Sequence, residues 1–297
     1  MTLSIIITGT SSGLGTAAAR TLAQAGHTVF AAMRGVAGKN AEAARELKAA
    51  GCRPIEIDVT SDASVAAGVA AAHETAGRID VLVNCAGIMW LGVTEAFSHE
   101  QFDTVMQTNL YGPFRMIKAV LPQMRAQGSG LVVSITSIAG RLLTPGAGIY
   151  AASKFALEAL AESLRYETSL MGIDSVIVEP GPFRTNLKAN GVPPADTATA
   201  AAYGELRALE QTIPPRMAAY LQQNPGQSTD PQAFADCIRD LIAMPAGTRP
   251  LRTTVGYDLG TKAINEAVAP HQSAYLGVMG LASLEQTHNT TAGGDGR

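Results

Sequence analysis

The segment TGTSSGLG, residues 8–15, constrains the fold of this chain more than any other feature. It follows an apolar run over 3–8 that predicts a strand, and it opens a stretch over 14–26 that predicts a helix. Glycines let the backbone turn tightly there, and the free N–H groups of a helix N-terminus attract a pyrophosphate. The segment predicts a dinucleotide site. The residues expected to contact the dinucleotide are Gly9, Ser11, Ser12, Gly13, Leu14 and Gly15.

Short apolar runs alternate with longer amphipathic or alanine-rich stretches along the chain, which predicts parallel βαβ units. The run Ile5-Ile6-Ile7 is apolar on both faces, as expected of a strand covered by helices on both sides. We therefore expect an α/β fold, a Rossmann-type doubly wound parallel sheet of about seven strands with helices on both faces. The expected strands are 3–8, 28–32, 53–58, 80–84, 130–135, 174–179 and 249–255, and the expected helices are 14–26, 39–50, 62–76, 99–127, 151–171, 197–223 and 231–244.

The 297 residues suit one α/β domain, because no linker divides the chain. We expect a single nucleotide-binding catalytic domain over 1–285. Within it, the stretch 186–230 is rich in Ala, Pro and Gln and predicts an insertion that covers the substrate. The polar, glycine-rich end of the chain, 286–297, predicts a disordered tail.

Composition excludes several kinds of partner. A net charge of −3 gives no reason to expect nucleic acid or an anionic membrane surface. Three scattered cysteines form no disulfide framework, which fits a reducing, cytoplasmic compartment. The apolar start, LSIIIT, is too short to span a bilayer. The five histidines show no metal-binding spacing, so no metal site is expected.

A second motif consists of Ser137, Tyr150 and Lys154. Tyr150 and Lys154 are four residues apart and share one face of a predicted helix. A tyrosine titrates near 10, and a neighbouring ammonium lowers that pKa, so Tyr150 becomes a usable acid or base. Ser137 follows the fifth expected strand, at the edge of the sheet where ligands bind.

These motifs together resemble the short-chain dehydrogenase/reductase family. The glycine spacing of TGTSSGLG, the 13 residues from Ser137 to Tyr150 and the four to Lys154 all match the family pattern. The segment Asn84-Cys85-Ala86-Gly87 resembles the family's NNAG, with Cys85 in place of its second Asn. Asp58-Val59, Asn109 and the segment Pro180, Gly181, Phe183, Thr185 also match, so the resemblance covers 3–185.

The resemblance implies a role for each matched residue. Tyr150 exchanges a proton with the substrate oxygen, Ser137 hydrogen-bonds that oxygen, Lys154 binds the nicotinamide ribose, and Asn109 anchors a water of the proton relay. Asp58 and Val59 contact adenine, and Asn84, Ala86 and Gly87 line the adenosine side. Pro180, Gly181, Phe183 and Thr185 hold the nicotinamide carboxamide. Hydride then passes between the nicotinamide and a substrate carbon.

Arg34 favours NADP(H) over NAD(H). NAD-binding sites of this kind place an acidic residue about 20 residues after the glycines, on the ribose 2′-hydroxyl. Here no acid lies between His27 and Gly38, and Arg34 stands 19 residues after Gly15. A guanidinium suits a 2′-phosphate, and Ser11 could add a hydroxyl donor. The segment is similar to NADP-preferring, hydroxysteroid-type members, while an exposed Arg34 with no preference leaves NAD(H) open.

The residues expected near the nicotinamide are apolar and predict a hydrophobic alcohol or carbonyl substrate. They are Met89, Trp90, Leu142, Leu143 and Ile149, together with Phe183. Two alternatives stay open: a non-catalytic NADP-binding regulatory relative, and an NAD-preferring dehydrogenase of a polar substrate. A sugar-nucleotide epimerase is disfavoured by the glycine spacing. The resemblance also implies a homodimer or homotetramer built from the helices around 99–127 and 151–171.

Overall fold

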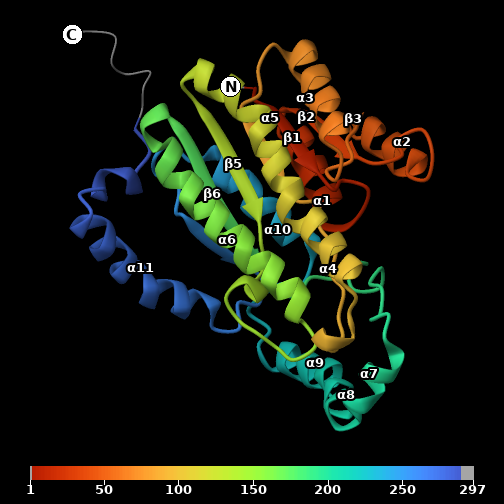
Figure 1. The fold of residues 1–297 in the computed structure, drawn as a ribbon. Coiled ribbons are helices and arrows are strands. Elements are labelled where there is room, and N and C mark those ends of the chain that lie inside the picture. The colour runs from red at the N-terminus through yellow and green to blue at the C-terminus, as the bar shows by residue number, and fades with distance from the viewer. Residues whose placement is uncertain (1, 289–297) are drawn as a thin grey trace.

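The structure, a computed structural model, describes residues 2–288. Its centre is a seven-stranded parallel sheet in the order β3-β2-β1-β4-β5-β6-β7 (Figure 1). The strands are β1 Ser4–Thr8, β2 Thr28–Met33, β3 Arg53–Glu56, β4 Val81–Asn84, β5 Gly130–Ile135, β6 Ile173–Pro180 and β7 Arg252–Val255. This confirms the predicted α/β class and doubly wound topology.

Helices cover both faces of the sheet, because alternate residues of each strand point to opposite sides. Ile5 and Ile7 of β1 pack with α1, α2 and α10, whereas Ile6 packs with α3, α5 and α6. The helices are α1 Gly13–Gln24, α2 Ala41–Ala49, α3 Asp62–Ala76, α4 His99–Met106, α5 Gly112–Gln127, α6 Gly148–Thr168, α7 Thr197–Ala202, α8 Gly204–Glu210, α9 Ile213–Gln223, α10 Pro231–Ala243 and α11 Thr261–Val278. Each of the two core clusters buries apolar side chains from one face of the sheet. Because the strands are apolar on both faces, both faces must be covered by helices.

Two predicted helices differ from the structure. The predicted helix over 99–127 is divided into α4 and α5 by a five-residue π-helix, Gln107–Tyr111. Such wide turns occur mostly at functional sites, and this one contains Asn109. The predicted helix over 197–223 is three short helices, α7 to α9, because Gly204 and the pair Pro214-Pro215 interrupt the helical pattern.

The helix α11, which the structure places after β7, was not predicted from the sequence. Pro270 lies in its middle, and only Thr261 and Leu276 of its residues are buried, so it carries no apolar stripe. The start of the predicted tail is tied down, since the His288 N–H donates to the Ser169 carbonyl at 2.8 Å. The rest of the predicted tail, 289–297, lies outside the described residues.

The carboxyl ends of the parallel strands form one edge of the sheet, and the loops that leave this edge carry the predicted site. The helices α7 to α9 lie at this end of the molecule, below α4 and α6 in the view of Figure 1. The chain leading into α7 rests on the loop after β4: the Asp196 N–H donates to the Ala96 carbonyl at 3.0 Å. The stretch 186–230 is thus positioned beside the loops that follow β4.

Candidate active site

The glycine loop packs directly on the segment that follows β4. Gly9 has φ +73°, and a Cβ there would lie 2.7 Å from the Ala86 Cα. A Cβ on Gly15 would lie 2.4 Å from the Gly9 carbonyl oxygen. The Thr8 hydroxyl accepts the N–H groups of Cys85 and Ala86 at 3.0 Å each. The loop therefore needs glycine at these positions, because a side chain there would collide with the backbone it packs on.

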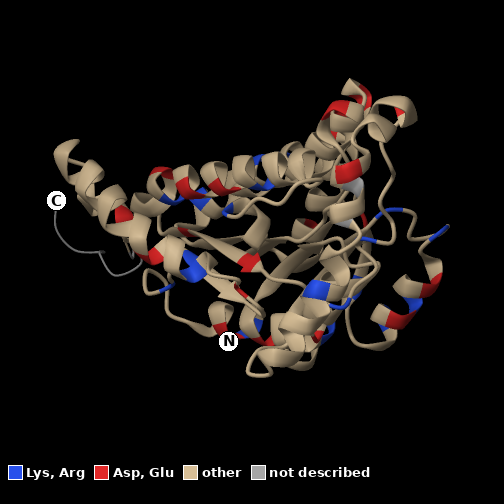
Figure 2. Ribbon diagram, turned by 90° about the horizontal axis from the view of Figure 1, so that it is seen from below, with Lys and Arg blue, Asp and Glu red and all other residues tan. Residues whose placement is uncertain are grey.

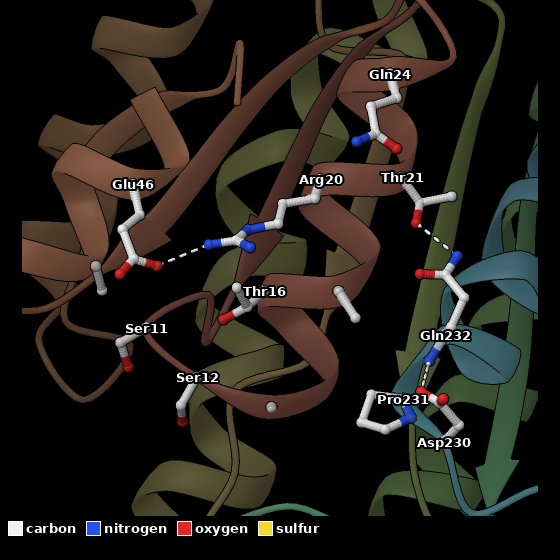
Figure 3. Close-up of a pocket in the computed structure, with 13 residues that line it drawn as sticks. Ser11, Ser12, Thr16, Arg20, Thr21, Gln24, Glu46, Asp230, Pro231 and Gln232 are labelled. Atoms are coloured by element: carbon white, nitrogen blue, oxygen red, sulfur yellow. Dashed lines mark hydrogen bonds and ion pairs between the residues drawn. The ribbon is translucent and has the colours of Figure 1, made fainter. Parts of the chain in front are cut away.

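The other loop residues take different positions. Gly13 has φ +61°, and its Cα faces Thr185, because a Cβ there would lie 3.2 Å from the Thr185 Cγ2. Leu14 packs its side chain against the core, so only its backbone can face a dinucleotide. Ser11 and Ser12 line a groove between α1 and the N-terminus of α10, together with Arg20 and Asp230 (Figure 3). The Arg20 guanidinium there is paired with Glu46 at 2.7 Å.

Ser137, Tyr150 and Lys154 come together at the end of β5. Tyr150 and Lys154 lie in the first turns of α6 and are both buried. The Lys154 Nζ donates to the Ile135 carbonyl at 2.9 Å and lies 5.9 Å from the Tyr150 ring centroid. Ser137 starts the turn that follows β5 and hydrogen-bonds with Tyr150. The structure thus brings a hydroxyl, a phenol and an ammonium to one buried point.

Burial sets the protonation of this cluster. It raises the pKa of Tyr150 above its ordinary value, and the hydrogen bond with Ser137 only partly opposes this. The direction is opposite to the lowering expected from Lys154. Lys154 hydrogen-bonds with Ile135 instead of the phenol, so it does not compensate for desolvation. Burial also lowers the pKa of Lys154 to about 8, while Cys85 and Glu158 oppose that shift.

Asn109 lies in the π-helix and is completely buried. Its Oδ1 accepts the Ile88 N–H at 2.8 Å, and its Nδ2 donates to the Ile88 carbonyl at 2.8 Å and to the Ser153 hydroxyl at 2.9 Å. Gly87 lies between Asn109 and Lys154, because a Cβ there would be 3.4 Å from the Asn109 Oδ1 and 3.7 Å from the Lys154 Nζ. Asn109 therefore joins the loop after β4 to α6 beside the predicted catalytic lysine.

Arg34 and Asp58 lie together on the side predicted to bind adenosine. The Arg34 guanidinium is half exposed and lies 3.9 Å from the Asp58 carboxylate. Burial raises the pKa of Asp58, but hydrogen bonds from Thr60 and the charge of Arg34 outweigh it and hold the pKa low. The neighbouring Val59 is buried, so only its backbone can contact a ligand.

Glu56 was missed by the sequence analysis. Its carboxylate accepts the N–H groups of Gly35 and Val36 at 2.8 Å each, in the turn directly after Arg34. It ends β3, so only the pairing of β2 with β3 brings it to this turn. Glu56 thus already uses two backbone donors of this turn, so an anion here would depend on side-chain donors such as Arg34.

The segment after β6 closes the opposite side of the site. A Cβ on Gly181 would lie 2.0 Å from the Tyr257 carbonyl oxygen, so this position requires glycine. Pro180 ends β6. Phe183 packs against Phe234 of α10, with ring centroids 6.3 Å apart, and against the core. Its ring thus anchors the segment to α10, and the expected position of Phe183 near the nicotinamide stays a prediction.

Asn84, at the end of β4, is buried, and neither its Oδ1 nor its Nδ2 has a protein partner. An unpaired buried amide is costly and is usually explained by a ligand or an ordered water. Its position next to Ala86 and the glycine loop makes it the clearest sign, among the described residues, of a missing polar partner at this edge.

The predicted substrate residues lie on two loops that touch each other. The Gly92 N–H donates to the Gly146 carbonyl at 2.7 Å, and Gly191 packs against the Met89 carbonyl. Trp90 and Leu142 are half-buried, and Leu143 is 69% exposed. Ile149 is only 2% exposed, so it belongs to the core and not to a pocket wall, because it lies on the inner side of α6.

A buried charged cluster behind the site also escaped the sequence analysis. Glu158 of α6 and Glu179 of β6 are almost inaccessible, and Arg252 of β7 binds Glu158 at 2.9 Å and lies 4.0 Å from Glu179. Asn265 of α11 donates to Glu179 at 2.6 Å. Burial and the neighbouring Glu158 raise the pKa of Glu179 to about 7. Only the crossing of four elements creates this cluster.

We expect the Glu179→Gln substitution to stabilise the protein more at pH 8 than at pH 5. The folded pKa of about 7 exceeds the unfolded value, so the native state binds more protons and its stability falls as pH rises through 4.5–7. The variant does not undergo this loss of unfolding free energy, which is on the order of 3 kcal/mol for such a pKa shift. Urea unfolding at pH 5 and pH 8 measures the difference.

Glu162→Gln provides a matched control for that experiment. Burial raises the pKa of Glu162, but hydrogen bonds from Arg252 and Tyr166 lower it by more. The pKa of Glu162 is therefore below its usual range. The Glu162→Gln substitution should therefore not stabilise the protein more at pH 8 than at pH 5. Equal effects of the two variants, or none at Glu179, would contradict the assignment.

Comparisons with known proteins agree with the fold. The family model described as short chain dehydrogenase matches residues 4–194, so the chain belongs to the short-chain dehydrogenase family. It is 38% identical over 186 residues to a 3-ketodihydrosphingosine reductase of Bacteroides thetaiotaomicron, covering 63% of this chain and 66% of the relative. It is 39% identical over 191 residues to human 17-beta-hydroxysteroid dehydrogenase type 1, covering 61% and 57%. The matched part thus spans slightly under two thirds of these curated relatives.

Two solved structures extend the likeness to most of the chain. A short-chain dehydrogenase from Streptomyces avermitilis superposes with a TM-score of 0.73 at 30% identity, covering 94% of this chain and 98% of that one. An alcohol dehydrogenase of the archaeon Thermococcus sibiricus, complexed with 5-hydroxy-NADP, gives a TM-score of 0.66 at 25% identity, covering 86% and 96%. Both matches include the region beyond residue 194, where the family model ends.

Two further properties concern residues 2–288. In this part of the chain, no helix combines the length and apolar character needed to cross a membrane. The same residues contain no group of three or more His, Cys, Asp or Glu side chains arranged to hold a metal ion.

Proposed function

We propose that this protein is an NADP(H)-dependent oxidoreductase that interconverts a hydrophobic secondary alcohol and its ketone, or a primary alcohol and its aldehyde. One observation carries the proposal: Tyr150 and Lys154 lie buried together at the end of β5, with Ser137 hydrogen-bonded to Tyr150. A buried phenol beside an ammonium and a hydroxyl is suited to proton exchange with a carbonyl or alcohol oxygen.

The residues present fit a nicotinamide dinucleotide. The glycine loop packs tightly on its own backbone and on the segment after β4, and next to it Asn84 offers a buried amide without a protein partner. In the proposed complex the N-terminus of α1 holds the pyrophosphate, and Asp58 with the Val59 backbone holds adenine. Gly87 leaves Lys154 accessible to the nicotinamide ribose, and the Pro180–Thr185 segment holds the carboxamide. The bound cofactor supplies or accepts the hydride.

The proposed mechanism assigns one task to each side chain. In the reductive direction, Tyr150 donates its phenolic proton to the carbonyl oxygen. Ser137 hydrogen-bonds the same oxygen and stabilises its developing negative charge. Lys154 binds and orients the ribose. Asn109 hydrogen-bonds with Ser153 and with the Ile88 backbone and so fixes the loop after β4. In this proposal a proton returns from solvent to the site beside this loop.

Arg34 supports NADP(H) as the preferred cofactor. Its guanidinium is half exposed and free of short ion pairs, with Asp58 at 3.9 Å. It can therefore bind a 2′-phosphate, assisted by the Ser11 hydroxyl. NAD(H) is the alternative, because Glu56 adds negative charge to the same turn and disfavours a phosphate.

Exposed apolar residues on the loops and helices near the proposed site support a hydrophobic substrate. Leu143, Leu209, Ile213 and Tyr220 are exposed on the loop after β5 and on the helices of 186–230. Apolar side chains left in water near a site favour an apolar ligand. The names of the sphingosine-type and steroid-type relatives support the same class. In this proposal the stretch 186–230 covers the substrate.

An assay with several substrates tests the proposal. Absorbance at the reduced nicotinamide band should report turnover when NADPH is mixed with decanal, 2-decanone, cyclohexanone or estrone. We expect oxidation of NADPH with an apolar member and a slower rate with NADH. If the protein binds NADPH but turns over no carbonyl, the non-catalytic alternative replaces the proposal. If only polar carbonyls react, and with NADH, the alternative of a polar-substrate dehydrogenase holds.

Exposed aromatic residues support a homodimer or homotetramer. Phe102, Tyr111, Phe114 and Phe155 lie on α4 to α6, where the sequence predicted the contact between subunits. A cluster of exposed aromatic side chains is typical of an interface. The free thiols of Cys52, Cys85 and Cys237 support a reducing, cytoplasmic compartment. Sedimentation velocity of the purified protein tests the oligomer.

A further inference from the structure

The lysine of the proposed site is backed by a buried carboxylate on its own helix. Glu158 lies one turn after Lys154 in α6, and both side chains face inward and are at most 5% exposed. The Glu158 side chain packs on the turn that carries Ser137, since a Cβ on Gly140 would lie 3.0 Å from the Glu158 Cγ and 3.4 Å from the Lys154 carbonyl oxygen. Glu158 therefore lies immediately behind the catalytic cluster.

Arg252 fixes the orientation of this carboxylate. Its Nε binds Glu158 at 2.9 Å, and its other nitrogen binds Glu162, which lies one further turn along α6. Because β7 pairs with β6, Arg252 reaches α6 across the sheet edge, close to Glu179 at 4.0 Å. Two acidic residues of α6 and one of β6 thus share one guanidinium, and the cluster holds an excess of negative charge.

We propose that Glu158 is a positioning residue, whose carboxylate, held by Arg252 behind Lys154, keeps the Lys154 side chain charged for binding the nicotinamide ribose. This inference rests on the proposed function, because it assumes that Lys154 binds the ribose. The role needs no contact with substrate. It explains why a glutamate, and not an apolar residue, occupies this nearly inaccessible position next to the lysine.

The surrounding charges agree with this role. Burial is the main cause that lowers the pKa of Lys154 to about 8, and Glu158 is one of the groups that oppose the shift. The Cys85 thiol also faces Lys154, but burial raises its pKa to about 12, so it stays neutral. Burial raises the pKa of Glu158 itself, while Arg252 and Arg141 oppose that shift, and Glu162 and Glu179 belong to the same cluster. Thus Glu158 is the near carboxylate that supports the ammonium.

The pH dependence of NADPH binding tests the inference without any substrate. We expect the Kd of the wild-type protein for NADPH, measured by fluorescence, to rise above about pH 8 as Lys154 loses its proton. The 2′-phosphate titrates near 6 and does not interfere in this range. The Lys154→Met variant should lack this limb, which assigns the limb to Lys154.

In the Glu158→Gln variant the limb should move about one pH unit lower, because an opposite charge near the ammonium has been removed. The Glu158→Asp variant, which keeps the charge, should restore most of the wild-type profile. Glu162→Gln is the matched control: it removes the same charge from the same arginine, but farther from Lys154, and should leave the limb in place. Thermal unfolding of each variant verifies that it is folded.

Three results would overturn the inference. The first is a Glu158→Gln limb at the wild-type pH, and the second is an equal shift in Glu162→Gln. The third is a limb that persists in Lys154→Met. None of these affects the proposed function, which depends instead on turnover and on Tyr150. Conversely, if the wild-type protein does not bind NADPH, the proposed function itself is wrong.

Discussion

The Tyr150→Phe variant should turn over its carbonyl substrate about 1000-fold more slowly than the wild-type protein, since a positioned acid or base contributes about 10²–10⁴-fold. Phenylalanine keeps the ring, and Tyr150 is almost completely buried, so the packing at the start of α6 should survive. Only the hydroxyl that hydrogen-bonds with Ser137 is lost. The loss should therefore appear in kcat, while the Kd for NADPH stays within a few-fold.

The measurement is a steady-state assay of kcat with the best carbonyl of the panel, combined with NADPH fluorescence for the Kd. Tyr275→Phe is the matched control, because Tyr275 is 56% exposed on α11. It should leave kcat unchanged. Turnover by Tyr150→Phe at a tenth or more of the wild-type rate would contradict the assignment of Tyr150 as the proton donor.

The second large effect is expected at the cofactor. In the Arg34→Asp variant, kcat/KM for NADPH should fall about 100-fold, because a hydrogen bond to a charged group contributes about 1.5–3 kcal/mol and each 1.4 kcal/mol is tenfold. The half-exposed guanidinium lies 3.9 Å from Asp58, so the new aspartate would also repel both that carboxylate and a phosphate. The value for NADH should change much less, because NADH has no 2′-phosphate.

Parallel assays with NADPH and NADH give the ratio that decides this prediction. Arg45→Asp makes the same charge change at an exposed position of α2 and should leave the ratio unaltered. An unchanged NADPH/NADH ratio in Arg34→Asp would show that the guanidinium does not bind the phosphate, and Glu56 at the same turn would then point to NAD(H).

Local pattern was sufficient for the fold and for much of the candidate site. The apolar strands, the glycine turn and the spacing of Ser137, Tyr150 and Lys154 depend on interactions between residues close in sequence or on simple periodicity. Their order along the chain predicted a parallel sheet, and the loops at one edge of such a sheet must meet. The match of the family model to residues 4–194 confirms the predicted family.

Sequence was a poor guide where stability comes from contacts between distant elements. The helix α11 has almost no buried face and a proline in its middle, so it lacks the periodicity that reveals a helix. The burial of Ile149 and the contact between Phe183 and Phe234 likewise depend on how α6 and α10 pack.

The sequence by itself determined the class of fold and the position of the glycine turn, and it predicted which residues exchange a proton, because each follows from short-range spacing and side-chain chemistry. Only the tertiary structure decided how those groups are charged. Burial raises the pKa of Tyr150 and lowers that of Lys154, and the carboxylate behind the lysine is held by an arginine from β7. Desolvation and long-range charge depend on which elements meet in space, and no local pattern contains that information.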